Sequence, residues 1–153
     1  MMQKFLMISF LFSINSYCAT IGSLTLRGVV PQLVSVSVSS ETIATSLPLD
    51  ITQNDTKVAT INERSNSHTG YSVMISSANS GNLKRVSGTE TLSYVLKYNG
   101  SAVNLASGQT FNYASAGVTN INRDINISYT GSDLSTVKSG TYEDTVTFSI
   151  SSI

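Results

Sequence analysis

The feature that most constrains the fold of this chain is a two-residue alternation of apolar and hydroxyl-bearing side chains. It is clearest in the stretches 34–39 and 145–150, where Val, Phe or Ile alternates with Ser or Thr. Successive side chains of a β-strand point to opposite faces, so each stretch predicts a strand with one apolar and one polar face. Beyond the N-terminal apolar run, no long stretch places apolar residues at helical spacing. The chain is therefore predicted to be all-β.

Further strands are expected between turns rich in Gly, Asn and Ser. The strongest local signal is Asn99-Gly100 between two alternating runs, because both central residues of a type I′ hairpin turn need positive φ. Seven or eight short strands of this kind predict a Greek-key β-sandwich. Besides 34–39, the predicted strands cover 47–51, 57–63 (with Ala59 and Ile61 inward), 71–75, 92–98, 101–105, 121–129 and 141–150. Phe111 and Tyr113 mark either a short strand or an aromatic loop anchor.

Residues 1–19 have the features of a secretory signal peptide. Lys4 precedes the apolar run 5–14, and cleavage is expected after Cys18 or Ala19. The run is shorter than the roughly 20 residues that span a bilayer, so no membrane span is predicted in the mature chain. Cys18 is the only cysteine, which leaves the mature protein without a disulfide. A small exported domain of this kind must gain its stability from packing, a metal or association with other chains.

The row that follows the signal, residues 20–30, has two interpretations. At period two it places four positions on one side: Leu24, Leu26, Gly28 and Val30. The glycine leaves one position of this apolar row bare, so a neighbouring backbone or bulky side chain can approach closely. The row is either the first strand of a self-contained domain or a strand donated to a neighbouring molecule.

Little in the sequence points to catalysis or to nucleic acid. Nine basic and nine acidic residues give no basic surface. The only histidine, His68, lies in a polar turn with no cysteine beside it, so no zinc site or His-based catalytic pair is predicted. Asp50, Asn54 and Asp55 lack the spacing of a calcium loop and are interpreted as turn residues. We therefore expect no enzyme activity, no catalytic, metal or cofactor-binding residue, and no cofactor.

Two further side-chain groups are weaker signals. Glu63 and Arg64 are interpreted as surface charges that pair with opposite charges across strands, which suggests no mechanism. Tyr94 and Tyr98 share one strand face; they can either pack at the edge of the fold or line a platform that binds sugars.

The signal peptide, the alternating N-terminal row, the cysteine-free β-fold and the alternating last strand together resemble bacterial pilins of the chaperone–usher pathway. Residues 24–30 are similar to the pilin donor strand, including its glycine, and residues 140–150 to the last strand of pilins and of spore-coat-U-like secreted proteins. The absence of cysteine is closer to the CS1-type branch than to type 1 pilins.

This resemblance implies an immunoglobulin-like fold over residues 31–153 that lacks its last strand. A periplasmic chaperone would first fill the open groove, pairing with the strand that carries Val146, Phe148 and Ile150. At an outer-membrane usher, the N-terminal extension 20–30 of an identical or related subunit would replace it. The chain is then expected to pass through the periplasm to a cell-surface fimbria or to be secreted, with the receptor unknown. The alternative is a self-contained exported module, such as a lectin-like adhesin.

Overall fold

The computed structural model describes residues 20–114 and 117–153. The predicted signal peptide, residues 1–19 with Cys18, lies outside the described residues. The described chain is almost entirely β-structure and every strand pairing in it is antiparallel, which confirms the all-β prediction. Within these residues, no helix has the length and apolar character needed to cross a membrane.

The secondary structure consists of strands and one short 3₁₀ helix, η1 (Thr42–Thr45). Several strands have only two to four residues. The strands are β1 (Val34–Ser40), β2 (Gln53–Ser65), β3 (Gly70–Ser77), β4 (Asn82–Arg85), β5 (Thr91–Ser93), β6 (Val95–Tyr98), β7 (Ser101–Ala102), β8 (Gln109–Ala114), β9 (Thr119–Tyr129), β10 (Tyr142–Glu143) and β11 (Val146–Ser152).

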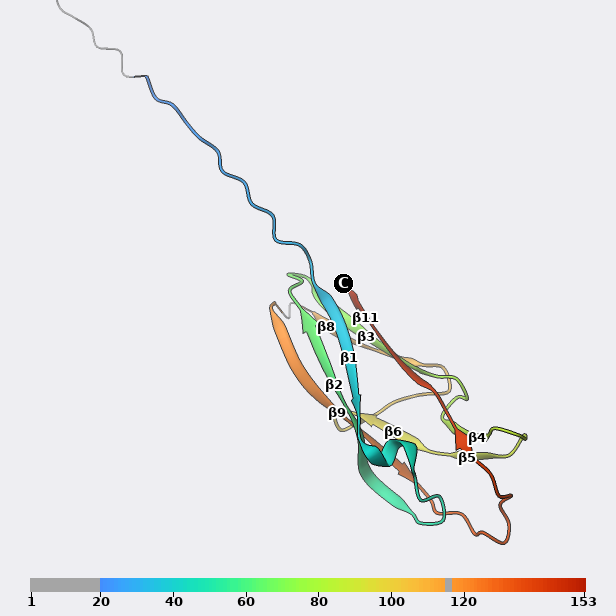
Figure 1. The fold of residues 1–153 in the computed structure, drawn as a ribbon. Coiled ribbons are helices and arrows are strands. Elements are labelled where there is room, and N and C mark those ends of the chain that lie inside the picture. The colour runs from blue at the N-terminus through green and yellow to red at the C-terminus, as the bar shows by residue number, and fades with distance from the viewer. Residues whose placement is uncertain (1–19, 115–116) are drawn as a thin grey trace, which may run out of the picture. The chain divides into compact units, whose positions relative to one another are not determined.

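These strands form three sheets (Figure 1). The largest has the order β1-β2-β9-β6-β7, the second β11-β3-β8 and the smallest β10-β4-β5. β2 and β3 follow each other in sequence but belong to different sheets. The chain therefore crosses from the first sheet to the second at the turn 66–69.

The first two sheets share one hydrophobic core. Inward-facing residues of β2, β3, β6 and β9 are buried with period two, as the alternating pattern predicts. Residues 31–153 form one compact unit around this core. Its buried strand residues include Ala59, Ile61, Tyr71, Val73, Ile75, Leu96, Tyr98, Ile125, Ile127 and Tyr129.

The predicted Asn-Gly hairpin is confirmed. β6 and β7 pair on either side of it, and Asn99 and Gly100 both have positive φ, 49° and 82°. β7 covers only Ser101–Ala102, so the second strand is shorter than the predicted 101–105.

One predicted strand is wrong and another is divided. Residues 47–51 form no strand, because Pro48 has no N–H to donate and its carbonyl accepts the Ile51 N–H across a turn. The predicted strand 92–98 is divided at Tyr94, whose N–H donates to the Gly81 carbonyl. The two halves, β5 and β6, consequently belong to different sheets.

Other strands have boundaries that differ from the predicted ones. The segment expected at 57–63 is part of the longest strand, β2, whose pairing with β9 includes register irregularities between Gln53 and Ala59. The final segment is interrupted at residues 144–145 into β10 and β11. The N-terminal row forms no strand here, since residues 20–30 have no regular secondary structure.

One charged side chain lies inside the core. Glu63 continues the inward-facing row of β2 and is fully buried. Its carboxylate accepts hydrogen bonds from the hydroxyl of Tyr71, at 2.9 Å, and from that of Tyr98, and it pairs with Arg123 Nε at 3.0 Å. Burial raises the pKa of the Tyr98 hydroxyl and the bond to Glu63 raises it further, so this hydroxyl stays protonated and donates.

Glu63 therefore pairs with an opposite charge across strands, as predicted, but the prediction that it lies at the surface is wrong. Arg64 is exposed, and the cation that pairs with Glu63 is Arg123 from β9. The Arg123 guanidinium also stacks on the Tyr113 ring, 4.3 Å from its centroid. The cluster connects β2 and β9 of the first sheet to β3 and β8 of the second.

Replacing Arg123 by an uncharged residue should destabilise the domain. We expect Arg123→Leu to lower the free energy of unfolding by about 3–5 kcal/mol, because it leaves a buried carboxylate without its counter-ion. Urea unfolding of the mature domain measures this. The double variant Glu63→Gln/Arg123→Leu keeps an oxygen for the two tyrosine hydroxyls without the charge, and should recover more than half of the loss. A double variant as unstable as the single one would contradict this account.

Candidate functional site

The first strand of the domain is incompletely covered on its apolar face. Val34 and Val36 are half-buried, and Val38 is 49% exposed. Val38 is paired with Ile61 of β2, which is fully buried on the same sheet face. The core is therefore closed over β2 but open over β1.

The last strand has the same property. The inward residues of β11, Val146, Phe148 and Ile150, are all half-buried, whereas Thr147 and Ser149 between them are exposed. Phe148 and Ile150 pair with residues 75 and 73 of β3, which are fully buried. This alternation was predicted, but the incomplete burial could not be read from the sequence.

β1 and β11 are also both edge strands. Among the described residues each has one hydrogen-bonded neighbour, β2 for β1 and β3 for β11. The two strands lie close to each other without pairing (Figure 1). The space between them, called here the β1–β11 gap, has unpaired main-chain groups on both sides.

The two sides of the gap run in opposite directions. The start of β1 and the end of β11 are both attached to the turn between β2 and β3. The Asn66 N–H donates to the Leu33 carbonyl at 3.0 Å, and the Ile153 N–H donates to the Gly70 carbonyl at 3.3 Å. A strand that entered the gap would thus be parallel to one neighbour and antiparallel to the other.

A cleft of about 420 Å³ lies between the segment after β1 and the segment before β11. Residues 44–49 line one side, residues 140–145 the other, and Leu83 also contributes. Beside it is a pocket of about 330 Å³, lined mainly by the apolar residues Leu49, Leu92, Leu134, Val137 and Tyr142.

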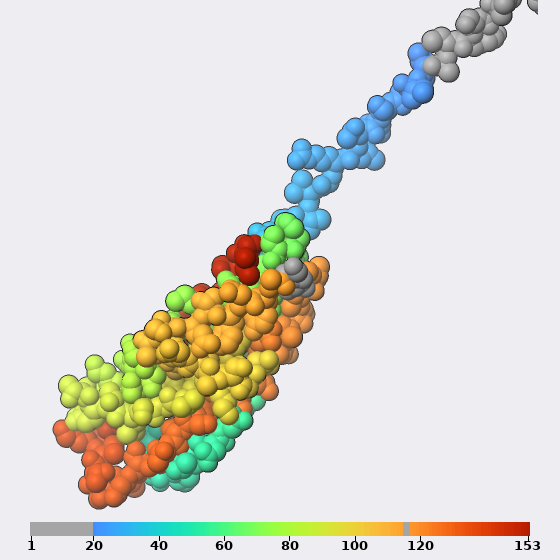
Figure 2. Space-filling model, turned by 180° about the vertical axis from the view of Figure 1, so that it is seen from behind, coloured from blue at the N-terminus to red at the C-terminus, as the bar shows by residue number. Residues whose placement is uncertain are grey.

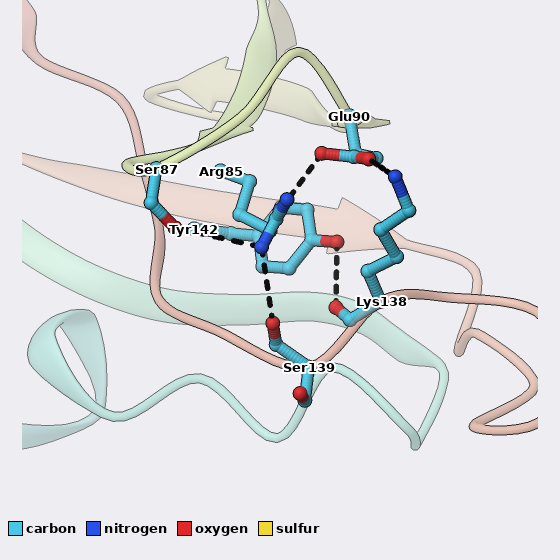
Figure 3. A network of polar contacts seen from close by, with 6 residues as sticks. All are labelled: Arg85, Ser87, Glu90, Lys138, Ser139 and Tyr142. Atoms are coloured by element: carbon cyan, nitrogen blue, oxygen red, sulfur yellow. Dashed lines mark hydrogen bonds and ion pairs between the residues drawn. The ribbon is translucent and has the colours of Figure 1, made fainter.

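A network of charged and polar side chains involves residues 138–142, which line these pockets (Figure 3). Glu90 accepts a hydrogen bond from Arg85 Nε at 2.7 Å and pairs with Lys138 Nζ at 2.5 Å. The hydroxyl of Tyr142 donates to the Lys138 carbonyl at 2.9 Å. The network attaches residues 138–142 to the turn between β4 and β5.

Asp144 fixes the start of β11. Its carboxylate accepts hydrogen bonds from the hydroxyls of Ser77 and Tyr94, at 2.5 and 2.6 Å, and from the N–H groups of Asn79 and Thr145. Burial raises the pKa of the Tyr94 hydroxyl, and the bond to Asp144 acts in the same direction. Neither Asp144 nor the Arg85–Glu90–Lys138 network was predicted, because Asp144 lies far in sequence from Ser77 and Tyr94, and Lys138 lies far from Glu90.

The N-terminal row exposes its apolar side chains. Leu24, Leu26 and Val30 are each more than four-fifths exposed. A Cβ built on Gly28 would have no atom within 4 Å. No strand pairing joins residues 20–30 to the sheets.

The other residues considered in the sequence analysis form no binding or metal site in the described structure. Tyr94 and Tyr98 are buried, so they form no exposed sugar platform. His68 is an exposed loop residue. Asp55 pairs with Lys97 at 2.9 Å, and the described part of the chain contains no cluster of side chains that could hold a metal ion.

No protein-family model and no curated protein matches this chain.

The charged network should persist at low pH. Hydrogen bonds from Lys138 and Arg85 lower the pKa of Glu90 to about 2. Because the folded pKa lies below the ordinary value, the network's contribution to stability is complete above about pH 4.5 and is lost as the pH falls toward 2. The Glu90 carboxyl ¹³C shift followed by NMR should show this pKa, and Lys138→Met should raise it. An unchanged Glu90 titration in that variant would contradict the assignment.

Proposed function

We propose that this protein is a structural subunit of a bacterial surface fimbria, assembled by a chaperone–usher pathway. In this proposal residues 31–153 form an immunoglobulin-like Greek-key β-sandwich that lacks one strand. The N-terminal strand of a neighbouring copy completes it by inserting into the β1–β11 gap. The export route leads through the periplasm to the cell surface.

Two observations, taken together, support the proposal. Residues 20–30 present an alternating apolar row that the chain leaves exposed, while β1 and β11 present alternating apolar rows that the chain leaves partly uncovered. β1 and β11 have seven residues each, the same number as Leu24–Val30. An inserted strand of this length would run about 23 Å between them at 3.3 Å per residue.

Such a strand would supply the two things that the gap lacks, main-chain hydrogen-bond partners and cover for its apolar side chains. Its main-chain groups would pair with the free edges of β1 and β11, which gives affinity. Leu24, Leu26 and Val30 would enter the core between the two sheets, and Gly28 would allow close approach where a side chain does not fit. A periplasmic chaperone strand would occupy the same gap before assembly, until exchange at the outer-membrane usher.

The alternative, a self-contained lectin-like adhesin, has no structural observation in its favour. It relied on tyrosines as a sugar platform, and all six tyrosines among the described residues are buried or half-buried. The experiment that separates the two functions is a denaturing gel of unboiled protein sheared from the cell surface. A strand-exchanged fimbria gives a ladder of multiples, and a self-contained module gives only a monomer band.

Gly28→Leu should block polymerisation without affecting the monomer. The added side chain would collide within the gap of the receiving copy, whereas around Gly28 in its own chain there is free space. Gel ladders and monomer melting temperatures measure the two effects. Thr25→Leu, on the opposite side of the row, is the matched control and should still polymerise. Normal ladders from Gly28→Leu would refute the donor role of this residue.

Moving the row should produce a stable monomer. If residues 20–30 are removed and appended after Ile153 through a flexible linker, they can fill the gap of the same molecule. Burying Leu24, Leu26 and Val30 at about 1.5–3 kcal/mol each contributes on the order of 5–9 kcal/mol before ordering costs.

The fusion should therefore melt well above the chain that lacks residues 20–30, and it should not form ladders. Changing Leu24 and Leu26 of the appended row to Ser should remove most of the gain, measured by calorimetry. If the unaltered mature chain is a stable monomer that never associates, the proposed function fails.

A further inference from the structure

β8 leaves a further free edge on the domain, away from the β1–β11 gap. The second sheet has the order β11-β3-β8, so among the described strands β8 pairs only with β3. With six residues, β8 is the longest free edge in the described chain apart from β1 and β11. Figure 2 shows this segment, in yellow-orange, at the surface of the domain. The edge is therefore open to another chain even when the gap is occupied.

The pairing of β3 identifies the free main-chain groups of β8. The Ile153 N–H donates to the Gly70 carbonyl, and the Ala78 N–H donates to the Thr145 carbonyl. Successive residues of an antiparallel strand direct their main-chain groups to opposite sides. The even-numbered residues of β3 therefore bond to β11, and the odd-numbered ones bond to β8.

The odd-numbered residues of β3 pair with the odd-numbered residues of β8. The N–H and C=O groups of Thr110, Asn112 and Ala114 consequently point away from the sheet. Within the described part of the chain, no hydrogen bond outside the strand pairings uses these groups. The side chains of the same three residues are exposed.

We propose that two copies of the chain pair side by side through β8, antiparallel and related by a twofold axis at Asn112. The second sheets of the two copies would then form one continuous sheet. This inference goes beyond the proposed function and does not depend on it, because β8 and β11 are opposite edges of their sheet.

The register of the pair follows from the free main-chain groups. With Asn112 opposite Asn112 of the second copy, Thr110 lies opposite Ala114 on both sides of the axis. Each of these pairs would exchange both of its N–H···O bonds, so every outward-pointing group of the strand would have a partner. A register centred on Phe111 would instead place Ala114 opposite Gly108, which has a φ of 74° and lies outside the strand.

The inward side chains also suit a pair of identical strands. Phe111 would lie opposite Tyr113 of the second copy in a non-hydrogen-bonded pair, where side chains approach most closely. Both rings are only half-buried in the single chain, so pairing would cover more of their surface. Aromatic cross-strand pairs stabilise antiparallel strands, and the twofold axis would form this pair twice.

The charges of the strand favour a second copy as the partner. Pairing with an identical strand would bring any charged residue near its own like charge, which destabilises a sheet. β8 contains no charged residue and no proline, both of which commonly protect a free edge. Arg123, which stacks on Tyr113, is neutralised by Glu63 within each copy.

Disulfide formation at the axis tests the contact. In the full mature chain carrying Asn112→Cys, two thiols would lie in a hydrogen-bonded pair whose Cα atoms are about 5.5 Å apart. A disulfide spans Cα separations of about 4.4–6.8 Å. Copper-catalysed air oxidation should therefore convert most of this variant to a covalent dimer on a boiled, non-reducing gel.

Thr110→Cys is the matched control, because residue 110 is exposed on the same face of the same strand. In the proposed register it lies four residues from residue 110 of the second copy, about 14 Å away, so no disulfide should form. The double variant Thr110→Cys/Ala114→Cys restores an opposed pair and should dimerise, which keeps the test valid if Asn112→Cys does not fold. Unaltered protein controls for the native Cys18.

The gel separates this contact from strand exchange, because boiling in detergent dissociates strand-exchanged ladders and leaves disulfides intact. No covalent dimer from either opposed pair would overturn the β8 contact while leaving the proposed function standing. Equal dimer yields from Thr110→Cys and Asn112→Cys would indicate random collision and would also overturn it. Covalent dimers from the opposed pairs, with no ladder from unboiled protein, would support the β8 contact and count against the proposed function.

Discussion

A strand at the edge of a sheet needs cover for its apolar face and partners for its free main-chain groups, and β1 and β11 have neither in full. Their inward side chains are half-buried or exposed, while Ile61, Val73 and Ile75, which pair with Val38, Ile150 and Phe148 one strand further in, are completely buried. Both strands border the same gap, so a single inserted strand would satisfy both.

Polar clusters connect the two sheets and fix the segments beside the cleft. Near the turn between β2 and β3, Glu63 and Arg123 connect the first sheet to tyrosines of the second. Beside the cleft, Asp144 and the Glu90 network fix residues 138–145 to β3 and to the β4–β5 turn. Hydrogen bonds between segments distant in sequence give a defined geometry that apolar contact alone does not supply.

Period-two alternation was sufficient to predict the strands that face the core, as in the row Tyr71, Val73 and Ile75. The Asn99-Gly100 turn was predictable because its backbone geometry is local. The division at Tyr94 was not, since it depends on a hydrogen bond to the Gly81 carbonyl that only the folded chain forms. The burial of Glu63 was implied by its register with Ala59 and Ile61, but its charge favoured the surface interpretation until Arg123 was placed beside it.

The remaining question is why the row would be given to another copy rather than inserted into the chain's own gap. To enter its own gap, it would have to form a hairpin with β1 through residues 31–33. Tight hairpins need residues that accept positive φ, such as Asn or Gly, whereas this connection is Pro-Gln-Leu. Pro31 and Leu33 are moreover held by Asn66, and turning the chain back would break those bonds. Residues 31–33 therefore oppose self-closure, and in the proposed assembly both the row and the gap would remain available to a neighbour.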